Sequence, residues 1–373
     1  MSAKYFRFFT IIILILFLFS CHDTKKTKEN GRQDFIRIKD SLVLDIPFLP
    51  RSKYIYSTEW DGKEALLIIE PMTLKKILVF DINGNPVDTV DISHMVNRLK
   101  GQFENMSVFS RDSILFYTYA QIIMSDSHGK VFKLFNLKDM FNDEWYFFLN
   151  YFIEHNLQRT SFLISNLGWL GKRKGKRGDS IDFKRFKKPD LAIISKGGRI
   201  IKILSYDEWF SDHPFYETST ANIKICRDGH ILLWIPYTNK LVFMDTINFE
   251  MEKKWKIQSE SVKSYAPMLP PGYKKKTTYY RATHGAINDI EYNPKEEKYY
   301  VLVQDSVPGL DWNRRNERKY ALLIYDKQGK KREEKIIPAG KYIPYANFVS
   351  DKGFWILRKY DYDKKKLVFD LVD

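Results

Sequence analysis

Hydrophobic and polar residues follow one another in short runs along most of the chain, and residues typical of tight turns separate the runs. The clearest example has runs, in order, at Ala221–Cys226, His230–Ile235, Lys240–Asp245 and Met251–Ile257, with Arg227-Asp228-Gly229 between the first two. Each run has the length of a β-strand and is rich in β-branched or aromatic residues. This stretch predicts four consecutive antiparallel strands joined by short connections.

The same order of strands and turns recurs along the chain. Six units align, and their second strands start at residues 65, 113, 161, 230, 299 and 354. A repeat of about 40 to 50 residues, lengthened by insertions, is typical of β-propeller blades. The pattern predicts an all-β propeller of six four-stranded blades, and five or seven blades are the alternative counts. A pair of β-sandwiches is the alternative, but it does not explain the repeated unit.

The two ends of the repeat are incomplete. The last unit has predicted strands at Tyr345–Val349, Phe354–Arg358 and Lys366–Leu371 but no fourth strand, whereas Phe35–Ile46 is a predicted strand outside any unit. An unpaired edge strand exposes backbone hydrogen-bonding groups, and closure of the ring removes that edge. We therefore expect the N-terminal and C-terminal strands to pair with each other.

Glycines mark the predicted hairpin turns. Between third and fourth strands they occur in Asn83-Gly84, His128-Gly129, Gly197-Gly198 and Gln328-Gly329, and between first and second strands in Asp61-Gly62, Asp228-Gly229 and Lys352-Gly353. A tight hairpin needs positive φ, which glycine adopts without steric cost.

The first residues of the chain have the pattern of an export signal. Lys4 and Arg7 precede an apolar run from Phe8 to Phe19 that only Thr10 interrupts. Such a run spans about 18 Å as a helix, which is shorter than the ~30 Å hydrocarbon core of a bilayer. It therefore predicts a cleaved signal peptide over residues 1–20 rather than a membrane-spanning helix.

The predicted signal peptide ends in Leu18-Phe19-Ser20-Cys21, which resembles a bacterial lipobox, although Phe19 is bulkier than the usual residue. The resemblance implies that Cys21 carries the lipid of a lipoprotein, and an ordinary core cysteine is the alternative. The polar residues 21–33 predict a flexible tether, and residues 34–373 predict a single propeller domain.

The lipobox and blade phrases such as Lys76-Ile77-Leu78-Val79-Phe80-Asp81-Ile82-Asn83-Gly84 resemble an uncharacterised family of six-bladed-propeller-type lipoproteins of the Bacteroidota, a domain of unknown function. The resemblance covers nearly the whole mature chain. It implies a lipid-anchored protein of the cell envelope and carries over no catalytic residue. Surface-displayed lipoproteins of this group have an acidic cluster after the cysteine, whereas here lysines follow Asp23. This difference favours an outer-membrane protein that faces the periplasm.

Composition narrows the class of protein. The 373 residues contain 61 Lys and Arg against 46 Asp and Glu, and aromatic residues make up 16% of the chain. Two cysteines are too few for a disulfide framework, a zinc ribbon or an iron–sulfur centre. The export signal argues against nucleic acid as a partner despite the net positive charge. The protein is expected to attach to the membrane through its N-terminal lipid.

The long insertions between predicted strands all fall at one rim of the predicted ring. They occupy residues 137–147, 166–190, 205–220, 258–285 and 305–319, whereas the other rim has short turns. Variable loops gathered on a rigid scaffold often form a binding site, although functionally neutral insertions are the alternative.

Basic residues concentrate in one of these insertions. Between Lys172 and Lys188 nine basic residues face two acidic residues, and the candidate ligand contacts there are Lys172, Arg173, Lys174, Lys176 and Arg177. Trp145, Trp209 and Trp312 are the candidate aromatic contacts in other insertions. An anionic glycan, lipid phosphates or an acidic envelope protein would suit such a surface, and a solvated basic loop is the alternative.

Two insertions share an acidic phrase beside a tryptophan, Asp143-Glu144-Trp145 and Asp207-Glu208-Trp209. Paired carboxylates suit glycan hydrolysis, so a glycan-directed hydrolase or lyase is the alternative function. Capping of a helical turn explains the same residues. Common catalytic and cofactor motifs are missing from the sequence, and Asp81-Ile82-Asn83-Gly84-Asn85 begins like a calcium loop without its glutamate. We expect no cofactor or metal, and a binding or scaffold module is favoured over an enzyme.

Overall fold

A computed structural model gives the three-dimensional structure of the chain, which divides into two compact units, Met1–Phe35 and Ile36–Asp373. It describes residues 35–46, 55–70, 76–98, 103–118, 121–136, 153–155, 161–165, 191–195, 199–204, 222–226, 230–236, 238–245, 247–262, 284–307, 317–358, 360–361 and 363–372. The predicted boundaries of the signal peptide and the tether lie outside these ranges and stay predictions.

The described strands of the second unit form six four-stranded antiparallel sheets. Three of them are β2–β5 (Ile55–Trp60, Lys63–Ile69, Lys76–Asp81, Pro86–Asp91), β6–β9 (Phe103–Ser110, Ser113–Thr118, Gln121–Ser125, Val131–Asn136) and β10–β13 (Ile153–His155, Ser161–Ser165, Leu191–Ser195, Ile200–Leu204). Two more are β14–β17 (Asn222–Ile225, His230–Trp234, Lys240–Asp245, Met251–Lys256) and β18–β21 (Ala286–Asn293, Lys298–Gln304, Tyr320–Asp326, Lys331–Ile337).

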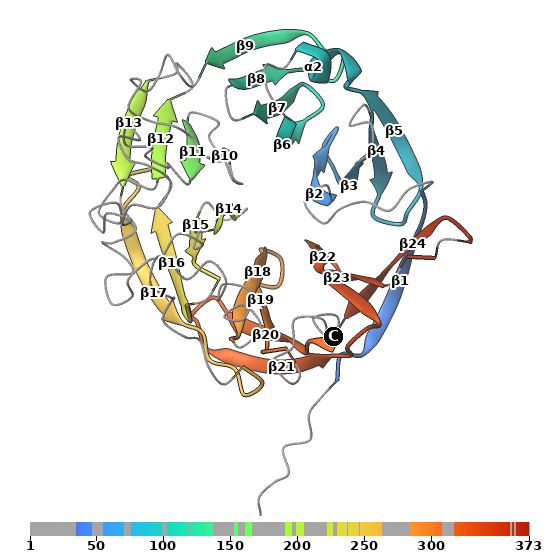
Figure 1. Ribbon diagram of the computed structural model, residues 1–373, viewed down its shortest axis with the longest axis vertical. Helices are drawn as coiled ribbons and strands as arrows, with labels where there is room; N and C mark the ends of the chain where they lie inside the picture. Colours follow the sequence, from blue (N-terminus) through green and yellow to red (C-terminus); the bar gives the residue numbers. More distant parts are fainter. Residues whose placement is uncertain are drawn as a thin grey trace, which may run out of the picture. The chain divides into compact units, whose positions relative to one another are not determined.

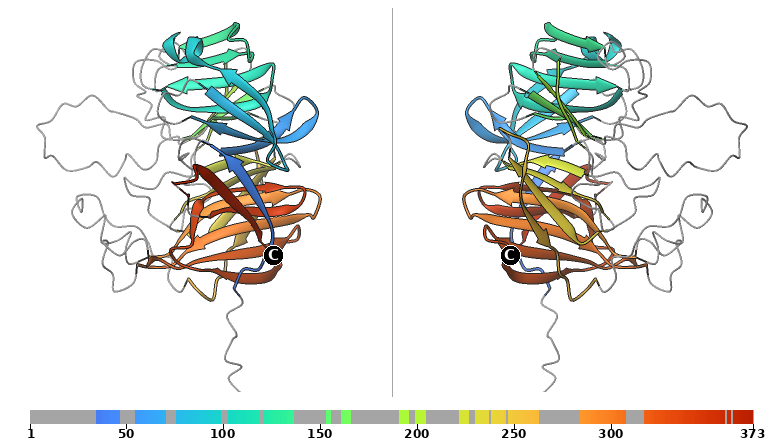
Figure 2. Two further views of the ribbon diagram at one scale, coloured as in Figure 1. Left: turned by 90° about the vertical axis from the view of Figure 1, so that its right-hand side faces the viewer. Right: turned by 90° about the vertical axis from the view of Figure 1, so that its left-hand side faces the viewer.

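The remaining sheet joins the two ends of the chain. It contains β22 (Tyr342–Ser350), β23 (Gly353–Arg358), β24 (Lys366–Val372) and, as its fourth strand, β1 (Ile38–Asp45). β1 and β24 pair antiparallel from Ile38 opposite Val372 to Asp45 opposite Lys366. Figure 2 shows the blue strand β1 beside the red strand β24. The predicted pairing of the terminal strands is confirmed, and we call this sheet the closing sheet.

The sheets of the second unit are arranged in a ring, with β2, β6, β10, β14, β18 and β22 nearest the central axis (Figure 1). This arrangement is a β-propeller, as the sequence predicts. A short helix, α2 (Ser93–Arg98), lies between β5 and β6, where the strand pattern predicts no helix. The Ser93 N–H donates a hydrogen bond of 2.8 Å to Asp91 Oδ1, which caps the helix, and Met95 of the helix is fully buried.

The hydrophobic core lies between neighbouring sheets. In β3, Leu67 and Ile69 pack with residues of β6–β9, whereas Leu66 and Ile68 pack with residues of the closing sheet. Alternate side chains of a strand point to opposite faces, and here both faces are covered. The middle strands therefore read as continuous apolar runs rather than as alternating ones.

One five-residue turn recurs between third and fourth strands. Asp81, Asp126 and Asp326 each accept hydrogen bonds of 2.8–3.0 Å from the backbone N–H groups two and four residues ahead. The predicted glycines at 84, 129 and 329 follow three residues after these aspartates and have positive φ. The turn chemistry explains why the Asp81 segment resembles the start of a calcium loop. Gly197, Gly198 and Gly229 lie outside the described residues.

These turns also contact the sheet before them in the ring. A Cβ atom at Gly84 would lie 2.9 Å from the carbonyl oxygen of Val43 in β1, and one at Gly329 would lie 2.5 Å from the ring of Trp255 in β17. The outer strand of one sheet therefore packs against the hairpin of the next. Glycine leaves room for this close approach.

Candidate functional site

The connections between the described strands confirm the predicted asymmetry of the ring. The longest ones join β9 to β10, β11 to β12, β13 to β14, β17 to β18 and β19 to β20. In an antiparallel sheet of four strands, connections from second to third strand and from one sheet to the next leave at the same rim. We call this rim the insertion rim and the opposite one, with the glycine turns, the hairpin rim.

The site residues predicted from the sequence lie outside the described residues. This holds for the lipidation candidate Cys21, the basic residues Lys172, Arg173, Lys174, Lys176 and Arg177, the tryptophans Trp145, Trp209 and Trp312, and the acidic residues Asp143, Glu144, Asp207 and Glu208. Their roles stay predictions.

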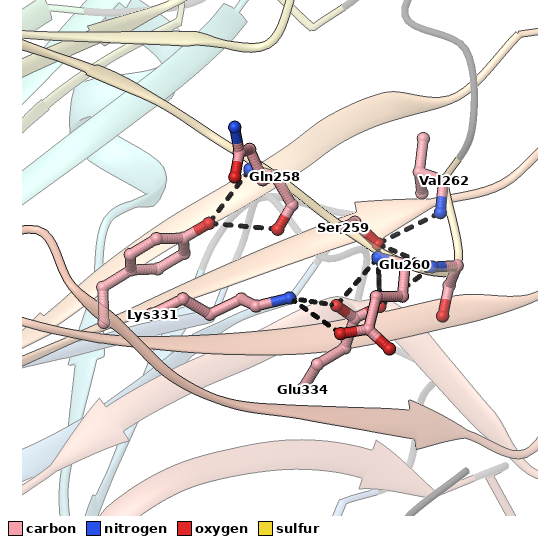
Figure 3. Close-up of polar contacts among 8 residues, drawn as sticks. Gln258, Ser259, Glu260, Val262, Lys331 and Glu334 are labelled. Atoms are coloured by element: carbon pink, nitrogen blue, oxygen red, sulfur yellow. Dashed lines mark hydrogen bonds and ion pairs between the residues drawn. The ribbon is translucent and has the colours of Figure 1, made fainter. Parts of the chain in front are cut away.

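The start of one insertion is described, and one carboxylate accepts several of its hydrogen bonds (Figure 3). Glu334 of β21 accepts hydrogen bonds from the Glu260 N–H at 3.0 Å, the Ser261 N–H at 3.0 Å and the Ser259 hydroxyl at 2.8 Å. Lys331 Nζ lies 2.9 Å from the same carboxylate. These contacts fix the chain that follows β17 to the outer strand of the neighbouring sheet.

The ionisation of Glu334 follows from these contacts. Burial is the largest influence and would raise the pKa of the carboxyl group. The hydrogen bonds from Glu260, Lys331, Ser259 and Ser261 together outweigh it and lower the pKa from 4.5 to about 2. Glu334 is therefore charged at neutral pH and anchors the insertion rather than transferring protons.

A second polar group lies on the innermost strands of three successive sheets. It comprises Lys224 of β14, Asp289 and Glu291 of β18, and Asn347 of β22, and we call it the inner-strand cluster. Lys224 Nζ forms an ion pair with Glu291 and lies 3.7 Å from Asp289 Oδ1. Asn347 Nδ2 donates hydrogen bonds to Asp289 Oδ2 at 3.2 Å and to the Pro344 carbonyl at 2.9 Å. Asp289 therefore links neighbours on both sides.

Irregular strand pairing places these side chains. The pairing of β18 with β19 shifts register between Ile287 and Asp289, and that of β22 with β23 shifts between Ile343 and Asn347. Bulges in a strand redirect side chains and are frequent beside binding sites. Two irregularities in adjacent inner strands thus bring Asp289 and Asn347 within hydrogen-bonding distance.

Asn347 is 7% exposed, and its Oδ1 atom is buried without a hydrogen-bond partner among the described residues. Its amide nitrogen is directed at Asp289, so the amide belongs to the cluster. A buried acceptor without a donor is costly, by about 1–3 kcal/mol. Sequence reasoning missed this cluster. The available signal was the polar pair Asp289 and Glu291, two residues apart on a strand whose neighbours are apolar.

Metal binding finds no support in the part of the chain that the structure describes, where no three His, Cys, Asp or Glu side chains gather around one point. Over the same residues, no helix has the length and apolar character needed to cross a membrane.

Comparison with known proteins identifies the fold. A solved structure of a DUF4221 family member from Bacteroides vulgatus ATCC 8482 is similar with a TM-score of 0.71 and 14% identity, over 91% of this chain and 98% of that one. A protein of Bacteroides fragilis NCTC 9343 that bears the name of an exported protein is similar with a TM-score of 0.53 and 11% identity, over 91% and 96% of the two chains. No family model and no curated protein matches the chain.

Proposed function

We propose that the chain is a lipid-anchored protein of the cell envelope whose propeller, with its six sheets as six blades, is a binding or scaffold module. Lipidation at Cys21 and an outer-membrane location facing the periplasm rest on the lipobox-like sequence and the lysines after it. The name of the Bacteroides fragilis protein, which shares the fold, is consistent with export.

The observation that carries the binding function is the difference between the two rims. The described strands place the longest connections at the insertion rim, whereas the hairpin rim carries tight glycine turns. The largely buried carboxylate of Glu334 holds the start of one insertion in place. A rigid ring with long loops at one end is a common arrangement for ligand binding.

An acidic glycan is the ligand we propose for this rim. The insertion between β11 and β12 contains nine basic residues between Lys172 and Lys188, against Asp179 and Asp182. Binding that depends on charge weakens with salt, because exposed charges are screened beyond about 8 Å at physiological ionic strength.

The test compares two variants with the same change of charge. In the first, Lys172, Arg173, Lys174, Lys176 and Arg177 are replaced by Gln. In the matched control, five exposed lysines of the hairpin rim are replaced by Gln, namely Lys63, Lys130, Lys327, Lys330 and Lys352. Retention on immobilised heparin, used as the acidic glycan, is measured at increasing salt.

We expect the first variant to elute at lower salt than the control, with both melting near the temperature of the parent. Equal elution of the two variants would contradict the proposal. If the protein captured an acidic envelope protein and no glycan, the ligand of this rim would be a protein. Glycan cleavage abolished by Asp143→Asn or Glu208→Gln would assign the hydrolase or lyase alternative.

A further inference from the structure

A cavity of about 420 Å³ lies between the closing sheet and the sheet β2–β5, and we call it the seam groove. Its lining includes Asp45 of β1, Leu78 and Phe80 of β4, and Pro86 and Thr89 of β5. Leu78 lies opposite Thr89 in the pairing of β4 with β5. Phe80 lies opposite Pro86. Residues opposite each other share a face of a sheet, and here it is the face toward the closing sheet.

The packing of β4 and β5 explains why a cavity remains here. Phe80 belongs to the core shared with the closing sheet, and Leu78 packs against that core while staying partly exposed. From β5, Val90 joins the core on the opposite face, toward β6–β9. Pro86 and Thr89 are exposed. Within the described residues, the core between the two sheets therefore ends at β4 and leaves the outer part of this face open.

The sheet β18–β21 repeats the same arrangement. Counted from the turn aspartates Asp81 and Asp326, the residues equivalent to Leu78, Phe80, Pro86 and Thr89 are, in order, Leu323, Tyr325, Lys331 and Glu334. Both strand pairs also shift register at the same place, directly before Phe80 in one sheet and directly before Tyr325 in the other. The two sheets can therefore be compared position by position.

In the sheet β18–β21 these positions hold a segment of the chain (Figure 3). The Gln258 N–H donates a hydrogen bond of 3.1 Å to the Tyr325 hydroxyl. The Ser259 hydroxyl and the Glu260 N–H donate to Glu334 at 2.8 Å and 3.0 Å. This segment follows β17, the outer strand of the neighbouring sheet. The propeller itself thus shows that a peptide segment lies against this part of a sheet.

The seam groove lacks the polar groups that hold that segment. Phe80 has no hydroxyl where Tyr325 has one, and Thr89 takes the place of the Glu334 carboxylate. Pro86 likewise takes the place of an ammonium group. An occupant of the seam groove is therefore held by apolar contacts rather than by the hydrogen bonds of a carboxylate.

Two exposed apolar side chains lie beside the seam groove. Val87, which is 56% exposed, follows Pro86 in β5, and Val43 of β1 is 44% exposed. The Val43 carbonyl lies close to Gly84, which also lines the cavity. Apolar surface that continues from a cavity onto the outside of a protein is typical of a place that a partner covers.

The charges around the seam groove nearly balance. The carboxylates of two lining residues lie 3.5 Å and 3.7 Å from cations of neighbouring strands and turns, and two further lining residues carry opposite charges. These groups are Asp45 beside Lys366, Asp88 beside Arg111, and the residues Glu70 and Lys76. Burial of apolar surface, rather than charge, is therefore the driving force that this place offers to a ligand.

We propose that the seam groove binds an apolar peptide segment of a partner protein, which places one or two large apolar side chains in the cavity. An apolar cavity of about 150 Å³ is enough to bind benzene, so the seam groove has room for two such groups. The precedent for a peptide as occupant is the segment that follows β17 in the equivalent position. The seam groove is separate from the insertion rim and does not depend on the lipid anchor.

The test uses the full-length protein in lipid nanodiscs and isothermal titration calorimetry, with empty nanodiscs as the blank. The probe is the uncharged peptide acetyl-Ser-Phe-Ser-Leu-Ser-Gly-amide, which has two large apolar side chains on one face when it is extended. The comparison peptide has Ala in place of Phe and Leu. We expect the probe to bind about tenfold or more tightly than the comparison peptide, because burial of large apolar side chains drives binding.

Substitutions at Thr89 locate the binding site. Thr89→Trp should weaken binding of the probe about tenfold or more, because the indole ring fills the cavity. Thr89→Glu, which reproduces the equivalent Glu334, should weaken it severalfold, because an apolar side chain would then desolvate a carboxylate. Met251→Trp, at an exposed position of the outer strand β17, is the control and should leave binding unchanged. Circular dichroism verifies the fold of each variant.

Two further measurements separate this site from the insertion rim. Added sodium chloride should leave binding of the probe nearly unchanged, in contrast to binding that depends on charge. The variant with five glutamines between residues 172 and 177 should bind the probe like the parent, so that loss of glycan binding and loss of peptide binding are distinguishable.

The proposal is overturned if the probe does not bind, if the comparison peptide binds equally well, or if Thr89→Trp and Met251→Trp bind alike. Free indole is titrated in parallel as a small apolar ligand. Binding of indole that Thr89→Trp abolishes, without binding of the peptide, would assign the seam groove to a small molecule and overturn the proposal as well.

Discussion

The hydroxyl of Ser41 in β1 donates a hydrogen bond of 2.8 Å to the carboxylate of Asp370 in β24, 329 residues away. Asp370 is fully buried and also accepts from Arg358 Nε at 3.0 Å and the Tyr342 hydroxyl at 3.0 Å. The four side chains come from the four strands of the closing sheet. Burial, with the nearby carboxylate of Asp370 second, raises the pKa of Tyr342, so its hydroxyl stays a donor. One carboxylate thus ties the two ends of the ring together.

Replacement of Asp370 by Ala should destabilise the propeller strongly. It leaves the buried hydroxyl of Tyr342 without its acceptor, which costs about 1–3 kcal/mol, and it also removes the ion pair of Arg358. Asp45→Ala, in the same sheet at an 83% exposed side chain, should change the free energy of unfolding by about 0.5 kcal/mol or less. Urea unfolding followed by tryptophan fluorescence measures both. Equal losses would mean that the Asp370 network does not stabilise closure.

Gly84→Ala should cost more than Gly62→Ala, although both glycines have positive φ, 91° and 77°. A Cβ atom at Gly62 meets nothing within 4 Å, so this variant reports the backbone strain alone, about 1–2 kcal/mol. At Gly84 the added atom meets Val43 and Leu42 of β1, and overpacking adds about 1–3 kcal/mol. The difference between the two losses in free energy of unfolding measures the contact between the β4–β5 hairpin and β1. Identical values would show that β1 moves aside freely.

The contacts of the Glu334 carboxylate with the insertion should be lost in acid. The pKa of Glu334 is lowered on folding from 4.5 to about 2, so its contribution to stability is present above pH 4.5 and is lost as the pH falls toward 2. Glu334→Gln should therefore flatten the pH dependence of stability in this window. Glu333→Gln, on the same strand at an exposed ion pair with Lys335, is the control and should leave the dependence intact. Thermal unfolding between pH 2 and pH 5 gives the comparison, and parallel curves for all three proteins would refute the anchor.

Labelling with radioactive palmitate tests the predicted lipid anchor. Label should enter the wild-type protein and be absent from Cys21→Ala, because acylation requires the thiol of the lipobox-like sequence. Cys226→Ala is the control, since Cys226 is buried and should not affect labelling. Equal labelling of wild type and Cys21→Ala would remove the anchor from the proposed function.

Local pattern was sufficient for the strands and the turns. The alternation of apolar and polar residues is visible within a single strand. The turn hydrogen bonds of an aspartate such as Asp81 reach only four residues ahead, so strands and turns can both be predicted from neighbouring residues. Pairing of the terminal strands was predictable too, because the last unit lacked a strand and the N-terminus had one to spare. Helix α2 was missed since six residues give too little periodicity to identify a helix.

The inner-strand cluster could not be predicted from the sequence, because only the tertiary structure brings its residues together. In the sequence, Lys224, Asp289 and Asn347 are ordinary polar residues in three separate units. The ring sets their strands side by side, and the register shifts of β18 and β22 turn Asp289 and Asn347 toward each other. A register shift depends on packing against neighbouring sheets, which no local pattern records. Sequence thus determined the strands and their order, whereas tertiary contacts between distant strands determined which polar groups meet.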